Sequence, residues 1–217
     1  MSSEILFSDG ELLVVNKPAG LPTIPDGWEQ STTCLRDQLA VEFGRVWVVH
    51  RLDKITSGVI VFARNAEAHR SLSLLFETHQ VTKRYRALVC GLPDWKEMTS
   101  QAPLRADVGH RHRTAVDWKR GQPAVTRFLV RQGFAENALI EACPETGRTH
   151  QIRAHAYAIG FPILADRLYG APPTDLIARP ALHAHSLEFP FAGQQLAFTA
   201  PYPEDFAAAM NALGHTL

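Results

Sequence analysis

Apolar residues recur along this chain with two periods, and each period predicts a different kind of element. Short runs of β-branched and apolar residues bounded by Gly, Pro, Ser or Thr predict strands. The predicted strands cover residues 12–16, 48–49, 59–63, 83–90, 124–130, 138–143 and 182–187. Apolar residues three and four positions apart predict helices instead. The predicted helices begin after a cap at Ser31, Thr32 or Thr33, begin after Asn65, span residues 148–159 and span residues 203–213. Residues 94–123 are polar and turn-rich and predict hairpins and a loop.

A single carboxylate, Asp53, lies in the polar turn between the strands predicted at 48–49 and 59–63. A charge held between buried strands is costly unless a partner compensates it, and Arg51 is close enough in sequence to do so. Two interpretations are open from these residues alone. Asp53 could cap the turn through its own backbone, as Asp often does, or it could serve as a reactive carboxylate.

The polar–apolar alternation from Lys83 onward predicts a strand with one buried side. Tyr85 and Ala87 share one side with Lys83, and Arg84 and Arg86 lie on the other. A tyrosine on the inner side of a strand is most often a core residue whose hydroxyl finds a hydrogen-bond partner. The strand by itself therefore assigns no chemistry to Tyr85.

The helix predicted at 148–159 places Ile152 and Arg153 on the same partly apolar face, with Arg148 further round. An arginine on such a face requires an anionic partner. We expect that partner to be Asp53, because a guanidinium can hold a carboxylate through two hydrogen bonds and does not lose its proton.

The composition is that of an ordinary globular protein, since hydrophobic residues make up 46% of the 217 positions and charged residues 20%. No apolar run approaches the roughly 20 residues that span a bilayer. The first residues carry neither a basic start nor a long apolar segment, so we expect a cytoplasmic protein. Cys34, Cys90 and Cys143 are far apart and form no Cys-x-x-Cys pair, so neither a disulfide framework nor a zinc ribbon is predicted.

The charges balance overall, with 22 basic and 22 acidic residues, which by itself disfavours a nucleic-acid-binding protein. Their distribution is uneven. Residues 1–42 carry seven acidic and two basic side chains, whereas residues 105–127 carry six basic and two acidic ones. A field of this kind can steer a polyanion to one face, and a solvated basic loop explains the segment equally well.

Four short motifs carry a more specific signal. They are NKPAG at residues 16–20, HRLD at residues 50–53 followed by TSG at 56–58, KRYRA at residues 83–87, and TGRTHQIRAH at residues 146–155. Together they resemble the motifs of the RluA-type pseudouridine synthases, in that family's order and over most of the chain. One departure is Ala165, which stands where the family commonly has Gly.

The resemblance implies the pseudouridine synthase fold, an α+β fold in which a mixed, mainly antiparallel central sheet is flanked by helices and carries a catalytic cleft. It implies a single catalytic domain over residues 1–217, with no room before the first motif for the S4-like RNA-binding domain that many relatives carry. It also implies an isomerase that acts on tRNA or rRNA stem-loops as a monomer, without a cofactor, a metal ion, a membrane or an obligatory protein partner.

In the reaction that the resemblance implies, uracil leaves C1′ of the ribose, rotates and rejoins through C5. Asp53 is expected either to attack C1′ or to promote elimination through C2′, and both routes remain open. Tyr85 is expected to stack on the uracil and to act as a general base, and Ile152 is expected to pack on the uracil. Arg153 is expected to keep Asp53 ionised against the desolvation that burial imposes on a carboxylate.

The resemblance also implies contacts with RNA. His50 and Arg51 are expected to face the RNA, and Arg51 is expected to fill the gap left by a flipped nucleotide. The expected phosphate contacts are Lys17, Arg148, Arg111 and Arg113.

Two other functions are compatible with parts of the sequence. A protein that keeps this fold only to bind RNA would not need a buried carboxylate. A zinc hydrolase would use the histidine pairs His150 with His155 and His183 with His185, but no acidic or thiolate ligand stands near either pair at a familiar spacing.

Overall fold

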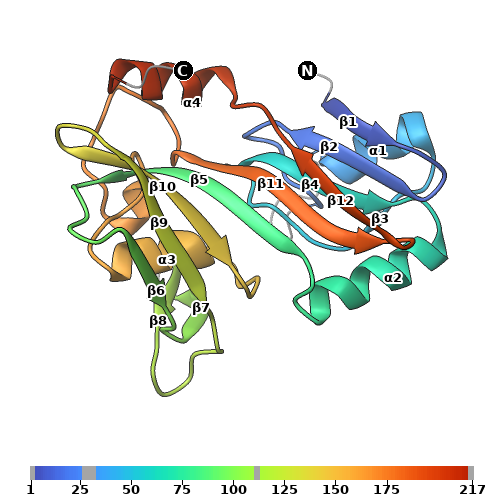
Figure 1. Ribbon diagram of the computed structural model, residues 1–217, viewed down its shortest axis with the longest axis horizontal. Coiled ribbons are helices and arrows are strands. Elements are labelled where there is room, and N and C mark those ends of the chain that lie inside the picture. The colour runs from blue at the N-terminus through green and yellow to red at the C-terminus, as the bar shows by residue number, and fades with distance from the viewer. Residues whose placement is uncertain (1–2, 26–32, 110–112, 215–217) are drawn as a thin grey trace. The chain divides into compact units, whose positions relative to one another are not determined.

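The computed structural model describes residues 3–25, 33–109 and 113–214. The chain forms two compact units that alternate along the sequence. Unit 1 comprises Met1–Lys83 and Ala184–Tyr202, and unit 2 comprises Arg84–His183 and Pro203–Leu217. Figure 1 labels the strands and the α-helices of both units.

Unit 1 contains a mainly antiparallel sheet and two helices. Its elements are β1 (Glu4–Ser8), β2 (Leu12–Lys17), α1 (Leu35–Phe43), β3 (Trp47–Val48), β4 (Ser57–Ala63), α2 (Ala66–Glu77), β12 (Gln194–Thr199) and, from Ala184 onward, β11 (Leu182–Phe191). β2 pairs with β1 and with β4, β3 pairs with β4, and β11 pairs with β12, all antiparallel. β4 is also hydrogen-bonded to β11, so it is an interior strand of this sheet.

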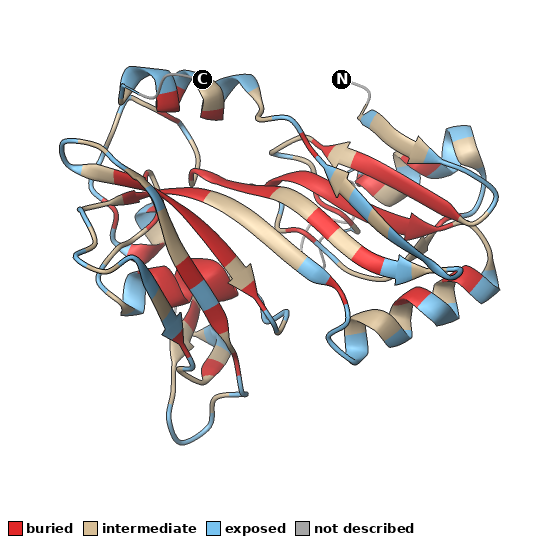
Figure 2. Cartoon of the chain, viewed as in Figure 1, coloured by how far each residue is buried: buried red, intermediate tan, exposed pale blue. Residues whose placement is uncertain are grey.

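The interior position of β4 follows from its sequence. Every residue of β4 is buried, as is the run Leu12–Val15 of β2 (Figure 2). A strand that is apolar without alternation is typical of a position covered on both faces. These two strands therefore form the centre of the core of unit 1.

Gly58, near the start of β4, lies against the backbone of β11. A Cβ atom placed on Gly58 would stand 2.1 Å from the carbonyl oxygen of Ala184, and its φ angle of +117° is one that side chains rarely permit. Only glycine satisfies both requirements. The glycine of the TSG motif therefore allows β4 and β11 to approach each other closely just after the turn that carries Asp53.

The two helices of unit 1 begin with different caps. The predicted N-cap of α2 is confirmed, because the side-chain oxygen of Asn65 accepts the N–H of Ala68 at 2.8 Å. The predicted cap of α1 is wrong. That helix begins after Cys34, which makes no side-chain cap hydrogen bond. Thr33 precedes this cap, and the other two expected caps lie outside the described residues.

Unit 2 contains a second set of antiparallel strands. Its elements are β5 (Thr82–Cys90) from Arg84 onward, β6 (Glu97–Ser100), β7 (Leu104–Val108), β8 (Arg113–Val116), β9 (Thr126–Gly133), β10 (Asn137–Pro144), α3 (Gln151–Ala158), the short helix η1 (Arg167–Tyr169) and α4 (Glu204–Ala212). β10 pairs with β5 and β9, β9 pairs with β6, and β7 and β8 form a separate hairpin. Of the hairpins expected between residues 94 and 123, the described residues contain one, formed by β7 and β8.

The helix predicted from residue 148 begins later, at Gln151. The side-chain oxygen of Gln151 accepts hydrogen bonds from the backbone N–H of Arg148 at 3.0 Å and from the hydroxyl of Thr146 at 2.6 Å. These bonds stabilise a turn where a first helical turn was expected. The predicted end of the helix is confirmed, because Gly160 adopts a φ angle of +90° just after the last helical residues.

The strand register of unit 2 determines which side chains face α3. Thr126 of β9 faces the helix, because its hydroxyl contacts two side chains of α3. Phe128 lies two residues further along and is paired with Ala142, which is paired with Tyr85. Paired and alternate residues share a face. Tyr85 therefore lies on the face of the sheet that α3 covers.

The α+β class and the mainly antiparallel pairing agree with the prediction from sequence. The single domain predicted over residues 1–217 stays a prediction, and what the structure describes is the division into two units. Among the residues it describes, no helix is long and apolar enough to cross a membrane.

We expect Gly58→Ala to lower the free energy of unfolding by roughly 3 kcal/mol or more, because the added methyl group meets a backbone carbonyl at a strained φ angle. Gly10→Ala is the matched control, since nothing lies within 4 Å of its Cβ position, and it should change the same free energy by less than about 0.5 kcal/mol. Urea denaturation measures both. Equal stability of the two variants would contradict the close approach of β4 and β11.

Candidate functional site

The turn that carries Asp53 is fastened to the rest of unit 1 through its main chain. The carbonyl of Asp53 accepts the N–H of Thr56 at 3.0 Å, and the carbonyl of Lys54 accepts the N–H of Gly20 at 2.7 Å. The second of these bonds joins the turn to the loop after β2. The backbone beside the Asp53 carboxylate is therefore held from two directions.

Thr23 fastens the same turn and is a residue that sequence reasoning misses. Its buried hydroxyl donates to the carbonyl of Leu52 at 2.9 Å and accepts the N–H of Leu52 at 3.2 Å. One side chain thus satisfies both backbone groups of the residue before Asp53. A threonine in a proline-rich loop carries no local sign of this function.

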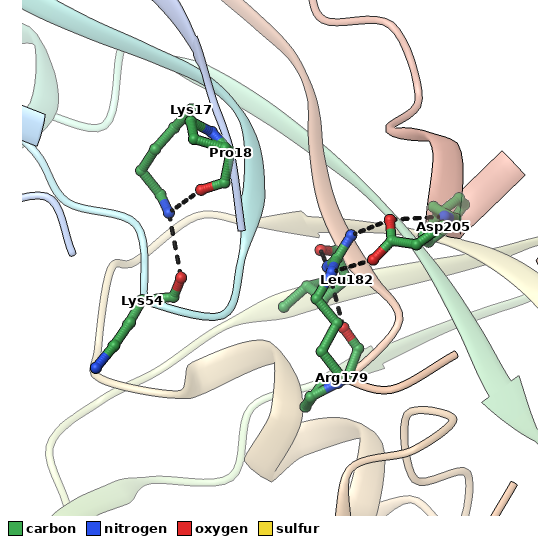
Figure 3. A network of polar contacts seen from close by, with 8 residues as sticks. Lys17, Pro18, Lys54, Arg179, Leu182 and Asp205 are labelled. Atoms are coloured by element: carbon green, nitrogen blue, oxygen red, sulfur yellow. Dashed lines mark hydrogen bonds and ion pairs between the residues drawn. The ribbon is translucent and has the colours of Figure 1, made fainter. Parts of the chain in front are cut away.

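Lys17 is fully buried at the end of β2. Its ammonium donates hydrogen bonds to the carbonyls of Pro18 at 2.9 Å, Leu21 at 2.7 Å and Lys54 at 3.4 Å. Figure 3 shows Lys17 with Pro18 and Lys54. A buried ammonium is costly unless its donors are satisfied, and these three carbonyls match its three N–H groups.

This burial does not favour the expected contact between Lys17 and an RNA phosphate, which stays a prediction. The ammonium has no exposed surface, so a phosphate could reach it only if the loop after β2 opened. In the structure, Lys17 joins that loop to the Asp53 turn through the carbonyl of Lys54.

His50 packs into unit 1 at the start of the turn. Its ring stacks on Phe76 with a centroid distance of 4.4 Å and an angle of 21°, and its Nε2 accepts the N–H of Val61 at 3.1 Å. Burial and the nearby Lys83 ammonium lower the pKa of His50 to about 3, so the imidazole is neutral at neutral pH. In the structure His50 packs within unit 1, and its expected contact with RNA stays a prediction. Arg51 is exposed.

Arg153 is buried on α3 and paired with a carboxylate of its own unit. Its Nε and Nη2 donate to the two carboxylate oxygens of Asp166 at 2.6 and 2.9 Å, and the two side chains are only 6% and 1% exposed. The guanidinium also lies over the ring of Tyr169, with Cζ 5.0 Å from the centroid. This arrangement fixes both the position and the plane of the guanidinium.

Sequence reasoning misses Asp166 and names Asp53 as the partner of Arg153; the second pairing stays a prediction. A signal for Asp166 does exist in the sequence. The residue before it, Ala165, has a φ angle of +63°, a conformation that strongly favours glycine. The glycine that the family commonly has at this position is therefore the sign of a tight turn, and Asp166 follows directly after it.

The other expected site residues of unit 2 lie on or near α3. Ile152 is buried on the helix and Arg148 is exposed just before it, where its Nε donates to the carbonyl of Pro123 at 3.1 Å. Tyr85 is partly buried on the sheet face that this helix covers. Unit 2 therefore supplies Tyr85, Ile152 and Arg153, whereas Asp53 belongs to unit 1.

The basic segment between residues 105 and 127 is only partly described. Arg111 lies outside the described residues. Arg113 begins β8 and its Cζ lies 6.0 Å from the ring centroid of Tyr157. Phosphate contacts by these two arginines stay predictions.

Within the described ranges, no group of three or more His, Cys, Asp or Glu side chains could hold a metal ion. His155, a ligand in the zinc alternative, uses both of its ring nitrogens inside unit 2. Nδ1 contacts the hydroxyl of Thr126 and Nε2 contacts the carbonyl of Ala102, each at 2.9 Å. Burial lowers the pKa of His155, which keeps this imidazole in its neutral form.

Comparisons with known proteins identify the class of protein to which this fold and these motif residues belong. A family described as RNA pseudouridylate synthase matches residues 11–158. The chain is 38% identical over 201 residues to the dual-specificity RNA pseudouridine synthase RluA of Escherichia coli (strain K12), covering 91% of this chain and 92% of that protein. It is 37% identical over 225 residues to the ribosomal large subunit pseudouridine synthase D of Nitrosomonas europaea, covering 97% of this chain and 65% of that protein.

A solved structure supports the same assignment. The human RNA pseudouridylate synthase domain containing 4 superposes with a TM-score of 0.81 at 26% identity, covering 97% of this chain and 92% of that chain. The chain belongs to the RNA pseudouridylate synthase family, and it is an RNA pseudouridine synthase, an isomerase. The expected family and fold are thereby confirmed.

We expect Lys17→Met to lower the free energy of unfolding by about 2–4 kcal/mol, because three carbonyl oxygens lose a charged donor. The slope of log affinity for RNA against log salt concentration should stay unchanged, whereas removal of a phosphate-binding cation would reduce it by about 0.7–0.9. Urea denaturation and RNA binding at several salt concentrations measure the two effects. Lys96→Met, at an exposed lysine, is the control for stability. A reduced slope of log affinity against log salt concentration, with an unchanged free energy of unfolding, would support the expected contact between Lys17 and a phosphate.

Two arginine–aspartate pairs of unit 2 should respond differently to the loss of their carboxylate. Asp166→Ala should lower the free energy of unfolding by about 3–5 kcal/mol, because it leaves the buried Arg153 guanidinium without its counter-ion. Arg179 holds Asp205 through bonds of 2.7 and 2.9 Å (Figure 3), but the Asp205 side chain is 46% exposed. Asp205→Ala should therefore lower the free energy of unfolding by only about 1 kcal/mol or less. Thermal or urea denaturation measures both variants, and a larger loss of stability in Asp205→Ala than in Asp166→Ala would contradict this expectation.

Proposed function

We propose that this enzyme converts a uridine of a tRNA or rRNA stem-loop into pseudouridine with Asp53 as its catalytic carboxylate. The observation that carries the proposal is the fastening of the Asp53 turn by Lys17, Thr23 and His50. A reactive carboxylate must be held close to its productive position, and a turn that only reversed the chain direction would not need three such side-chain contacts.

The chemistry asked of Asp53 balances within the substrate. The bond from C1′ to N1 breaks, a bond from C1′ to C5 forms, the proton of C5 is lost and N1 gains one. A carboxylate can begin this either by attacking C1′ or by promoting elimination through C2′. Neither route consumes a cofactor, and both give the same product.

Tyr85 and Ile152 are proposed to contact the detached uracil, with Tyr85 also moving a proton as a general base. Support comes from their placement in unit 2, where the face of the sheet that carries Tyr85 is the face that α3 covers. A ring and an aliphatic side chain suit a planar base that must rotate without leaving. Such a pocket has to be apolar enough to exclude water.

Arg153 is proposed to keep Asp53 ionised. Its support is the rigid setting of the guanidinium against Asp166 and Tyr169. Because Asp166 already balances the charge of Arg153, we infer that Arg153 acts on another carboxylate through directed hydrogen bonds more than through net charge.

The choice of RNA is the finer part of the proposal. One relative is named for dual specificity on RNA and another for the large ribosomal subunit, which supports a structured tRNA or rRNA target and hence a cytoplasmic enzyme. Arg51 and Arg148 are exposed and are proposed to meet the RNA, Arg51 in the gap left by the flipped nucleotide and Arg148 at a phosphate.

We expect wild-type enzyme to release tritium from tRNA and rRNA labelled at C5 of uracil, because bond formation at C5 must expel that hydrogen. Asp53→Asn and Asp53→Ala should lower the release rate by at least about a thousandfold while RNA affinity stays within a few-fold, since the carboxylate acts on the reaction and not on binding. Asp94→Asn, at an exposed carboxylate of unit 2, should behave as wild type.

Two outcomes would overturn the assignment. Normal release by Asp53→Ala would show that another group reacts with the ribose. No release by the wild-type enzyme from the combined tRNA and rRNA pool, with RNA binding intact, would favour a protein that keeps the fold only to bind RNA.

A further inference from the structure

One tryptophan of unit 2 presents its ring to solvent. Trp118, in the turn after β8, is 77% exposed. The other tryptophans that the structure describes are covered: the Cζ of Arg45 lies 4.7 Å from the ring centroid of Trp47, and the ring of Trp95 packs edge-on against Phe161 at 5.7 Å. Among the described residues, no ring or cation covers Trp118.

The turn that carries Trp118 is rigid. The Oδ1 of Asp117 accepts the N–H groups of Lys119 at 3.0 Å and Arg120 at 2.9 Å, and its carbonyl accepts the N–H of Gly121 at 2.7 Å. The N–H of Asp117 donates to the carbonyl of Pro103 at 2.9 Å. A Cβ atom on Gly121 would stand 2.7 Å from that carbonyl carbon, so the turn is also packed tightly against its neighbour.

Two positively charged residues belong to the same turn as Trp118. Lys119 and Arg120 follow it directly, both are exposed, and neither is paired with a carboxylate in the described part of the chain. The nearest acidic side chain in sequence, Asp117, is occupied: besides the two N–H groups it binds the Nη1 of Arg105 at 3.0 Å. The turn therefore presents one uncovered indole and two available cations.

An isolated exposed apolar residue usually needs no explanation. Trp118 differs because its ring is large, its backbone is fixed and its neighbours are cationic. A fixed backbone lowers the conformational entropy that a ligand would have to remove. A single ring is far smaller than the roughly 800 Å² per partner that a stable protein interface buries, whereas it matches the face of one nucleobase.

We propose that Trp118 is a stacking platform for an unpaired base of the bound RNA, with Lys119 and Arg120 holding the phosphates next to that base. Aromatic side chains beside cations are the usual means of binding single-stranded nucleic acid without reading its sequence. The inference rests on the proposed function, because the RNA it concerns is the substrate. It adds a contact that serves affinity and leaves the chemical step alone.

The test uses the intrinsic fluorescence of the protein and a 15-nucleotide oligouridylate. Binding should quench the wild-type fluorescence, and Trp118→Phe should lose most of that quenching while keeping affinity within about threefold, because a phenyl ring still stacks. Trp118→Ala should bind about tenfold more weakly. The double variant Lys119→Ala, Arg120→Ala should lower the slope of log affinity against log salt concentration by about 1.4, or about 0.7 for each of the two phosphates that these cations hold.

Two controls separate ring stacking from simple apolar burial. Val41→Ala removes an equally isolated apolar side chain, 90% exposed in unit 1, and should leave affinity unchanged. Trp118→Leu keeps an apolar side chain but no ring, and should bind as weakly as Trp118→Ala. Wild-type affinity in Trp118→Leu would overturn the proposal in favour of an apolar patch for a protein, and unchanged quenching in Trp118→Phe would overturn it outright.

Turnover distinguishes a failure of this inference from a failure of the proposed function. At saturating RNA, Trp118→Ala should release tritium from C5 at the wild-type rate, and only the RNA concentration for half-maximal rate should rise. If wild-type enzyme shows quenching that depends on Trp118 but releases no tritium, the proposed function fails and the stacking site stands. If release is normal and Trp118→Ala binds as wild type, the proposed function stands and the stacking site fails.

Discussion

The buried ammonium of Lys17 is the interaction on which the rest of unit 1 depends. It joins the end of β2, the loop that follows and the Asp53 turn through three carbonyl oxygens. In a core, such charged hydrogen bonds are strengthened by the low local dielectric, and a missing partner is correspondingly expensive. The arrangement therefore has few alternatives, which is what the proposed role of the Asp53 carboxylate requires.

Unit 2 also contains buried charged side chains that partners of opposite charge hold in place. Arg153 is held by Asp166, and Glu141 on β10 is held by Arg86 and Arg131. Burial alone would raise the pKa of Glu141, but the two arginines lower it below its usual value. Buried ion pairs add little net stability compared with apolar side chains of the same size. Their value here is that they fix the orientation of particular side chains, Arg153 above all.

The parts of the fold that follow from local patterns could be predicted from the sequence. Apolar runs predicted the strands, and Asn65 predicted the start of α2, because these features depend on residues close together in the chain. The cap of α1, the start of α3 and the partner of Arg153 could not be predicted in this way. The last two depend on a side chain that turns back on its own backbone or meets a distant loop, as Gln151 and Asp166 do. The cap of α1 gives no local sign, because Cys34 makes no side-chain cap hydrogen bond. The burial of Lys17 could not be predicted either, because its charge suggested exposure to solvent and only the fold reveals the three carbonyls that it contacts.

The alternation of the two units along the chain has a consequence for the synthesis of this protein. Unit 1 is completed only by β11 and β12, which the ribosome makes after the whole of Arg84–His183. At translation rates of roughly 5–20 residues per second, the β4 edge next to β11 waits on the order of ten seconds for its neighbour. An unpaired apolar strand edge is prone to pair with other chains. The nascent chain therefore passes through an interval of several seconds in which the edge of the strand that follows the Asp53 turn lacks its neighbour.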